Sequence, residues 1–424
     1  MLPAIFRGHT DAGFFAYALT FGTRKSPLAL MPGNQPPPQG RYICIIVVRD
    51  YHRMKARVAS AGSEHWHYTQ LEKPILDDVR AGRSAILFDL SNEGPAYDKL
   101  VFEELYRWIA TNSLPPQSCI WLAQNRAIEH HAYAHAGDNA KLVRFENYDY
   151  FVKLIAWAFS PACPRSIPGK DWEAFATRLG DVSAKTNTLL CLNATPRLPR
   201  VLTVAALHHH GLLAEAIVSF PGMQYVKQGA SAAEVDTFVD SHPALHYLRP
   251  ALGYVKQMQP IHADAFEDKG NALVMKVDPS PYERTCLSLV TESDFSDGRI
   301  ERITEKLAKA FCMGHPAFLV GNPRSVRFMS AFGFQDWSDV LSRRTEMQLD
   351  PALRFNSVFD EVITQISRIN SDRAQWLLTT REVSEYNVRH AVSGRFLSTY
   401  VDSIEGGVVD RLARSINGSL TLTK

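Results

Sequence analysis

The sequence predicts an α/β protein with two Rossmann-like domains that face a cleft, followed by a helical C-terminal tail. Short, continuously apolar runs alternate with amphipathic helical stretches, which is typical of a parallel sheet covered on both faces. A stretch with three prolines in ten residues, 160–169, interrupts this alternation and separates two such series. Beyond Asp350 the pattern becomes mostly helical. These three observations define the expected fold class.

The composition is that of a globular protein. The 424 residues exceed one ordinary domain, and 46% of them are hydrophobic while 21% are charged. A net charge of +2 gives no case for broad nucleic-acid binding. No apolar run reaches the ~18 residues of a transmembrane helix, and the N-terminus lacks a charged leader before a long apolar run. We therefore expect a cytoplasmic protein without a transmembrane segment.

The six cysteines lie far apart and form no Cys-x-x-Cys pair. Most of them stand inside apolar runs, as Cys44 does in the run 43–46. Without metal-ligand spacing, buried free thiols are the favoured interpretation over disulfides or a zinc site. We expect no metal site.

The first series of elements follows a Pro- and Gly-rich arm, residues 1–40. Residues 41–160 are expected to form the N-terminal Rossmann-like domain, and 161–187 the linker. Its predicted strands are 42–48, 84–90, 118–123 and 141–145, and its predicted helices are 97–110 and 148–159. Continuous apolar strands of this kind indicate burial on both faces.

The second series occupies residues 188–350 and is expected to form the C-terminal Rossmann-like domain. Its predicted strands are 189–192, 214–220, 286–290 and 316–320, with a helix over 199–210, another ending at Gly314 and a third after 322–325. Residues 351–424 form the expected tail, with helices over 354–370, 381–399 and 407–416.

Polar side chains lie in the connection between the strand 286–290 and the helix that follows it. Glu292 follows the strand, and the helix opens with Thr304, Glu305 and Lys306. Ligands of open α/β sheets bind at the carboxyl ends of strands, and helix N-termini favour phosphate. A cation such as Lys306 is unfavourable at the N-terminus of a helix, and an anionic ligand bound there would explain its presence. The carboxylate of Glu305 can accept hydrogen bonds from a ribose diol. The alternative is an amphipathic helix with solvated charges.

Two other loops carry residues suited to phosphate. The strand 189–192 leads into a loop with Asn193, Arg197 and Arg200, and arginine suits bidentate contact with a diphosphate. The strand 316–320 leads into Gly-Asn-Pro-Arg-Ser at 321–325, where Asn322 is a candidate contact although the spacing and lysine of a P-loop are absent. Ordinary surface loops are the alternative for both.

These residues carry a resemblance to a known family. Glu292-Ser293, followed by Ile-Thr-Glu-Lys-Leu at 303–307, resembles the donor-binding motif of the α1,3-fucosyltransferases. The continuation over 308–321 and the upstream Asn193-x-x-x-Arg197-x-x-Arg200 are also similar to that family and to related bacterial and phage glycosyltransferase-like proteins. The resemblance covers residues 190–320. It leaves base and sugar open, because Ser293-Asp294 replaces the family's Asn-Ser and Arg302 stands where an aromatic residue is expected.

The resemblance implies a GT-B glycosyltransferase that uses a nucleotide-diphosphate sugar as donor substrate, without a cofactor or a required metal. Glu305 would then bind the ribose or sugar, Lys306 a donor phosphate, Arg200 or Arg197 the diphosphate, and Glu292 the transferred sugar. The N-terminal domain would bind the acceptor. Basic side chains would neutralise the leaving diphosphate in place of a divalent ion.

An inverting transfer needs a base for the proton of the acceptor hydroxyl. Asp89 stands at the carboxyl end of the strand 84–90 and Glu93 follows it in the loop, and Glu93 is favoured because a loop carboxylate reaches further than one on the strand. A turn or helix cap built from Asp, Ser and Asn is the alternative for this segment.

The leading hypothesis is therefore a metal-independent glycosyltransferase whose acceptor, a glycan, a protein or a nucleic acid, is open. A non-catalytic scaffold of the same fold and a phage-type DNA-modifying glycosyltransferase are the alternatives. An NAD-dependent sugar-modifying enzyme is disfavoured, because no Gly-x-Gly-x-x-Gly follows the expected strands that end at Val48, Leu90 and Leu192.

Overall fold

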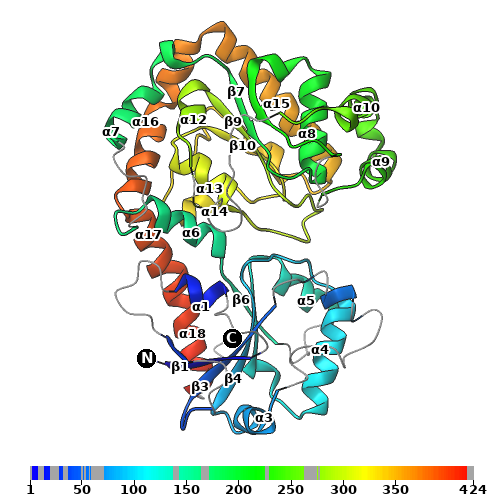
Figure 1. Cartoon of the computed structure of the whole chain (residues 1–424), viewed down its shortest axis with the longest axis vertical. Coiled ribbons are helices and arrows are strands. Elements are labelled where there is room, and N and C mark those ends of the chain that lie inside the picture. The colour runs from blue at the N-terminus through cyan, green and yellow to red at the C-terminus, as the bar shows by residue number, and fades with distance from the viewer. Residues whose placement is uncertain are drawn as a thin grey trace. The chain divides into compact units, whose positions relative to one another are not determined.

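The computed structural model describes residues 2–7, 14–19, 28–31, 37–48, 51, 54–56, 58, 71–136, 143–163, 171–224, 229–261, 275 and 277–417. The chain divides into two compact units (Figure 1). Unit 1 consists of Met1–Lys153 and Ser398–Lys424, and unit 2 of Leu154–Leu397. Each unit contains one wholly parallel sheet, so the α/β class and the Rossmann-like architecture are confirmed.

The sheet of unit 1 has six parallel strands in the order β2-β1-β3-β4-β5-β6. The strands are β1 Leu2–Arg7, β2 Leu28–Met31, β3 Tyr42–Val47, β4 Ser84–Leu90, β5 Cys119–Ala123 and β6 Arg144–Asn147. The order reverses between β1 and β3, as in doubly wound sheets. All residues of β3, β4 and β5 are buried, which explains their continuously apolar sequences.

Helices cover both faces of this sheet. Buried side chains of α3 (Lys73–Arg80) and α4 (Lys99–Thr111), among them Val79 and Phe102, form one core with Phe88 of β4 and Trp121 of β5. Helices α1 (Phe14–Ala18) and α18 (Gly406–Asn417) contact the same strand β4. Helix α5 (Ile128–Ala136) follows β5.

The sheet of unit 2 has four parallel strands in the order β10-β9-β7-β8. They are β7 Leu189–Leu192, β8 Ala216–Ser219, β9 Leu287–Thr291 and β10 Ala317–Val320. The order reverses between β7 and β9. Within the described residues, the α-helices of unit 2 are α6 Tyr150–Phe159 in its larger part, α7 Trp172–Leu179, α8 Leu198–His209, α9 Ala232–Asp240, α10 Arg249–Gln257, α12 Ser280–Arg284, α13 Glu305–Cys312, α14 Phe328–Ala331, α15 Pro351–Ser371, α16 Arg373–Val392 and the first half of α17 Arg395–Tyr400.

The N-terminal segment differs from the expected arm. Residues 1–40 contain β1 and β2, which extend the sheet of unit 1, together with α1. The apolar run of β1 is short and interrupted by Pro3, and β2 has only four residues, so neither gives a clear strand pattern. The prediction of a separate arm is wrong for these described residues.

The chain also passes between the units at places other than the expected linker. The first crossing, after Lys153, lies within α6, and the second, after Leu397, lies within α17. Helix α7 falls inside the expected linker 161–187 and contacts α16. The expected tail is divided: α15 and α16 belong to unit 2, whereas the last segment returns to unit 1. A helix that continues across a boundary leaves no composition signal.

Most other elements agree with the predicted ones to within a few residues. The expected helix 381–399 is instead α16 and α17, separated at Gly394, which has a left-handed φ of 82°. The start of the expected strand 141–145 lies outside the described residues, and β6 begins at Arg144. All six cysteines are free and buried, as predicted. None of the helices in the described ranges is both long and apolar enough to cross a membrane.

Candidate functional site

The candidate site lies at the carboxyl edge of the sheet in unit 2, where the strand order reverses. Three loops leave this edge: 193–197 after β7, 292–304 after β9 and 321–325 after β10. The crevice beside such a reversal is where open α/β sheets bind ligands. All eight predicted donor-binding residues lie on these loops or in the first turn of the helix that follows.

Asn193 joins the ends of three strands. Its backbone N–H donates to Ser219 Oγ at the end of β8 (2.8 Å), and its Oδ1 accepts a hydrogen bond from Thr291 Oγ1 at the end of β9 (2.5 Å). Its Nδ2 donates to Cys191 Sγ (3.3 Å). The side chain is buried and its polar atoms are used internally. Asn193 therefore positions the loop that leads to Arg200.

Glu292 fixes the N-terminus of α13. The side chain is buried, and its Oε1 and Oε2 accept hydrogen bonds from Thr304 N (3.0 Å) and Thr304 Oγ1 (2.6 Å). Thr304 is the N-cap of α13. A Cβ at Gly321 would lie 2.9 Å from Glu292 Cγ, so the loop after β10 packs directly on this carboxylate. Glu292 thus holds β9, α13 and the β10 loop together.

Glu305 and Lys306 form an ion pair in the first turn of α13. Lys306 Nζ lies 2.8 Å from Glu305 Oε1 and donates to Thr304 Oγ1 at 3.1 Å. Burial by itself would raise the pKa of Glu305, but the positive charges of Lys306 and Lys309 outweigh it and lower this pKa to about 2. Glu305 is therefore ionised and can accept hydrogen bonds at neutral pH.

Arg200 is a buried cation in the first turn of α8. Its side chain is 3% exposed, and Nη1 donates to the carbonyl oxygen of Thr195 (2.9 Å). Burial lowers the pKa of Arg200, while the charges of Glu292 and Glu305 oppose that shift, so the start of α8 faces the start of α13. Its Nε is buried and has no hydrogen-bond partner among the described residues. Arg197, the N-cap of α8, is exposed.

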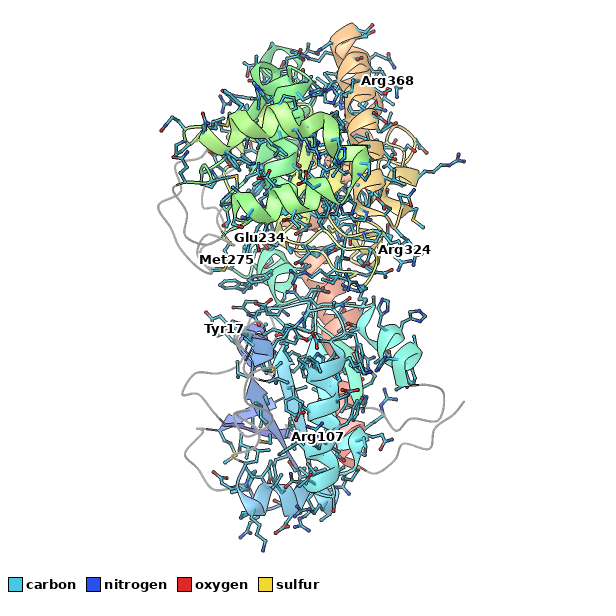
Figure 2. The ribbon with its side chains drawn as sticks, turned by 90° about the vertical axis from the view of Figure 1, so that its right-hand side faces the viewer. Tyr17, Arg107, Glu234, Met275, Arg324 and Arg368 are labelled. Atoms are coloured by element: carbon cyan, nitrogen blue, oxygen red, sulfur yellow. The ribbon has the colours of Figure 1, made fainter. Side chains whose placement is uncertain are left out.

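Asn322 presents a second donor at the same edge. Its Oδ1 accepts a hydrogen bond from Ser296 N (3.0 Å), which fixes the orientation of the amide. Its Nδ2 is buried without a partner in the described part of the chain. Two residues further, Arg324 has a left-handed φ of 62° and its Nη1 donates to Glu301 Oε1 (3.3 Å). Arg324 is labelled in Figure 2.

Arg354 positions these loops and was not among the predicted site residues. It is 1% exposed, and its guanidinium donates to four carbonyl oxygens. They belong to Gly321 (3.0 Å), Gln348 (2.7 Å), Leu349 (3.0 Å) and Ser296 (2.6 Å). The available sequence signal was an arginine between Ala352, Phe355 and Val358 on the apolar face of α15. Such a cation has to find acceptors inside the fold.

Among the described residues of the three loops, the buried side-chain atoms without a hydrogen bond are donors, apart from Asp294 Oδ2, which forms an ion pair with Arg302. The acceptor side chains of Asn193, Glu292, Asp294, Glu305 and Asn322 each have a donor or cationic partner. By contrast, Arg200 Nε and Asn322 Nδ2 are buried and unpaired among the described residues. A buried polar group without a partner is costly. This edge of the sheet is therefore suited to a ligand rich in acceptors, as a phosphate is.

The two candidate bases belong to unit 1. Asp89 is fully buried at the end of β4, and its oxygens accept hydrogen bonds from Phe15 N (2.9 Å), Ser91 N (3.0 Å) and Ser91 Oγ (2.6 Å). Burial raises the pKa of Asp89, whereas these hydrogen bonds lower it. Asp89 is thus an internal acceptor that binds the N-terminus of α1. This placement does not match the exposed loop carboxylate expected of a general base.

Glu93 lies in the turn after β4 and is half-buried. Its backbone N–H donates to the carbonyl oxygen of Leu90 (2.7 Å), and its own carbonyl oxygen accepts from Gln124 N (2.9 Å). The turn anticipated as the alternative is therefore present, with the carboxylate on a residue fixed by two backbone hydrogen bonds.

Among the described residues, no group of three or more His, Cys, Asp and Glu side chains is arranged to hold a metal ion. No protein-family model matches this chain, and no curated protein matches its sequence.

Proposed function

We propose that this chain is a glycosyltransferase of the GT-B type that transfers a sugar from a nucleotide-diphosphate donor, with inversion, to an acceptor hydroxyl. Unit 2 would bind the donor. The observation that carries the proposal is the pair of buried donors without a partner among the described residues, Arg200 Nε and Asn322 Nδ2, at the edge of the sheet where the helix of Lys306 also begins. The similarity of residues 190–320 to the donor-binding motif supports the same assignment.

The charges of the site suit departure of a diphosphate. In the transfer, the acceptor oxygen bonds to the anomeric carbon as the bond from that carbon to the phosphate oxygen breaks. The bonding pair leaves with the diphosphate, whose growing negative charge Arg200 and Lys306 would stabilise. Glu305, ionised and next to Lys306, would accept hydrogen bonds from the ribose or sugar hydroxyls.

The acceptor hydroxyl also loses a proton, which a general base has to take. Glu93 is the proposed base, because Asp89 already accepts three internal hydrogen bonds. Glu292 is proposed to act by positioning α13, since both of its carboxylate oxygens are bonded to Thr304.

Isothermal titration calorimetry of the protein with GDP, UDP, CDP and TDP tests the proposal. We expect at least one of them to bind, and Arg200→Lys and Lys306→Met each to weaken that binding about 10- to 150-fold, the factor for one hydrogen bond to a charged group. Arg249→Lys and Lys256→Met, which alter cations paired with Asp240 and Asp236 on neighbouring helices of unit 2, are the controls. Absence of binding to all four nucleotides would contradict the proposal.

Release of nucleoside diphosphate from the corresponding sugar nucleotide separates an enzyme from a scaffold. We expect release with the wild-type chain and its loss in Lys306→Met, with glycan, protein and DNA acceptors offered in parallel. Nucleotide binding without release in any of these assays would point to a non-catalytic scaffold instead.

A further inference from the structure

Unit 1 contains a pocket that none of the preceding chemistry uses. Its volume is about 430 Å³, within the range of small-molecule sites. The lining comes from the loop and helix after β5, from β6 and from the returning C-terminal segment; it consists of Arg126, Glu129, Arg144, Phe145, Glu146, Asn147, Ser403, Ile404 and Arg411. All of these residues belong to unit 1, so the pocket is defined without reference to unit 2.

The pocket lies beside β5 and β6, the last two strands in the sheet order of unit 1 and away from the reversal between β1 and β3. Arg126 follows β5 and Asn147 ends β6, so the lining includes the carboxyl edge of two neighbouring strands. The opposite wall contains Ser403 and Ile404 of a π-helix, Val401–Glu405. Single-turn π-helices are rare and occur frequently at functional sites. Two independent features of the backbone therefore meet at this pocket.

The three guanidinium groups in the lining are already neutralised. Arg126 Nη1 donates to Asp149 Oδ1 (2.9 Å). Glu146, which is 4% exposed, accepts from Arg144 Nη2 (3.0 Å) and from Arg411 Nε (2.7 Å to Oε2). With Glu129, three carboxylates face three guanidinium groups. The pocket is thus close to electrically neutral, which favours neither an anion nor a cation.

The unpaired groups of this pocket are acceptors. Asn147 Oδ1 is buried without a hydrogen-bond partner among the described residues. The carboxylate of Glu129, an exposed residue, has no hydrogen-bond partner among the described residues, and desolvation followed by the negative charge of Glu146 raises its pKa. This is the reverse of the donor-rich edge in unit 2. A suitable ligand donates hydrogen bonds without carrying charge.

We infer that this pocket of unit 1 binds a neutral polyhydroxylated ligand, a sugar or a cyclic polyol. Its hydroxyl groups would donate to Asn147 Oδ1 and to Glu129, while their oxygens would accept from the paired arginines and from Ser403. A charged donor such as an ammonium group would gain no net attraction, because the charges around the pocket already balance. The inference concerns the chemistry of unit 1 alone and stands whether or not unit 2 binds a nucleotide.

Saturation-transfer NMR on the full-length protein tests this inference, with methyl glucoside, lactose and myo-inositol as probes and inorganic phosphate and methylguanidinium as charged competitors. We expect at least one hydroxyl-rich probe to bind. Asn147→Leu and Glu129→Ala should each weaken it about two- to twelvefold, the factor for one neutral hydrogen bond. Glu103→Ala, which alters an exposed glutamate on α4 of the same unit, is the matched control.

Because Glu129 is exposed, its substitution leaves the fold intact and keeps the test valid if Asn147→Leu does not fold. Three outcomes would overturn the inference: no hydroxyl-rich probe binds, their binding is equal in Glu129→Ala and wild type, or phosphate or methylguanidinium displaces them at equal concentration.

Discussion

At the residue scale, buried polar side chains of unit 2 are held by specific partners. His315, 1% exposed in the turn before β10, illustrates this. Its Nε2 lies 3.0 Å from the carbonyl oxygen of Thr285, and its Nδ1 lies 2.7 Å from Ser288 Oγ. Burial, followed by the positive charge of Lys185, lowers the pKa of His315 to about 3, although the hydrogen bond to Thr285 opposes the shift. The folded protein therefore keeps a neutral imidazole here.

This lowered pKa predicts a pH-dependent stability. The unfolded chain binds a proton at His315 below pH 6.5, while the folded chain does so only near pH 3. His315 thus contributes stability that is complete above pH 6.5 and is lost as the pH falls toward 3. In His315→Gln this dependence disappears. The difference in free energy of unfolding between wild type and the variant should therefore shrink by about 1.4 kcal/mol per pH unit below 6.5. Urea denaturation at pH 7.0, 6.0 and 5.0 measures it.

Comparison with the variant isolates His315 from other groups. Burial raises the pKa of Glu346 to about 7, which removes stability as the pH rises from 4.5 to 7 in both proteins. Glu305, with its pKa lowered to about 2, contributes stability that is complete above pH 4.5 and is lost only as the pH falls below that value. If the difference in free energy of unfolding between wild type and His315→Gln stays constant from pH 7.0 to 5.0, the folded protein protonates His315 at its ordinary pKa.

At the element scale, α13 has a defined start and a defined end. Thr304 caps its N-terminus and is itself held by Glu292. After its C-terminus, Gly314 takes a left-handed φ of 59° in close contact with α16. A Cβ at Gly314 would lie 2.3 Å from the carbonyl oxygen of Ser384. The helix thus ends where only glycine fits both the backbone conformation and the packing.

Gly314→Ala should destabilise unit 2 by about 3 kcal/mol, because the left-handed conformation and the clash with a backbone atom act together. Gly253→Ala is the matched control: Gly253 is exposed within α10, and a Cβ there would meet nothing within 4 Å. This substitution should stabilise the protein by about 0.5–1 kcal/mol through helix propensity. Thermal denaturation measures both, and equal effects would contradict the role assigned to Gly314.

The elements of the sheets were largely predictable, and the exceptions have physical reasons. Strands β3, β4, β5, β7, β9 and β10 are almost wholly buried, so their sequences are mostly apolar. Strand β1 contains Pro3 and β2 has only four residues, so neither gives a clear strand pattern in the sequence. Pairing with β3 forms β1, and such pairing is a tertiary property.

At the scale of the whole molecule, the last segment of the chain belongs to the unit in which the chain begins. Glu405 is buried, and its Oε2 accepts from Lys153 Nζ (2.7 Å) and from Tyr148 OH (2.9 Å). Tyr400 OH donates to the carbonyl oxygen of Asp149 (2.9 Å). Lys153 is the last residue before the chain enters unit 2. These contacts tie the returning segment to residues at the crossing point.

Loss of the Glu405 carboxylate should therefore loosen unit 1 selectively. Glu405→Met leaves the fully buried Lys153 without its anionic partner, and we expect a loss of about 3–5 kcal/mol. Replacing both residues with Met should recover much of it, since the unpaired charge is gone. Hydrogen exchange should show faster exchange in β4 and β5, while β9 and β10 keep their protection.

Asp410→Asn, at an exposed position on α18, is the control for this experiment. Equal loss of protection in the sheets of both units would show that the two units unfold together and would contradict a role confined to unit 1.

The sequence alone determined the α/β class, most of the buried strands and the candidate residues at the carboxyl edge of the second sheet. It could do so because burial and strand termination leave periodic and compositional signals. Only the tertiary structure decided that β1 and β2 extend the first sheet, that the last segment returns to unit 1, and that the carboxylate oxygens of Glu292 and Asp89 accept internal hydrogen bonds. Those outcomes depend on contacts between residues far apart in the chain, which no local pattern encodes.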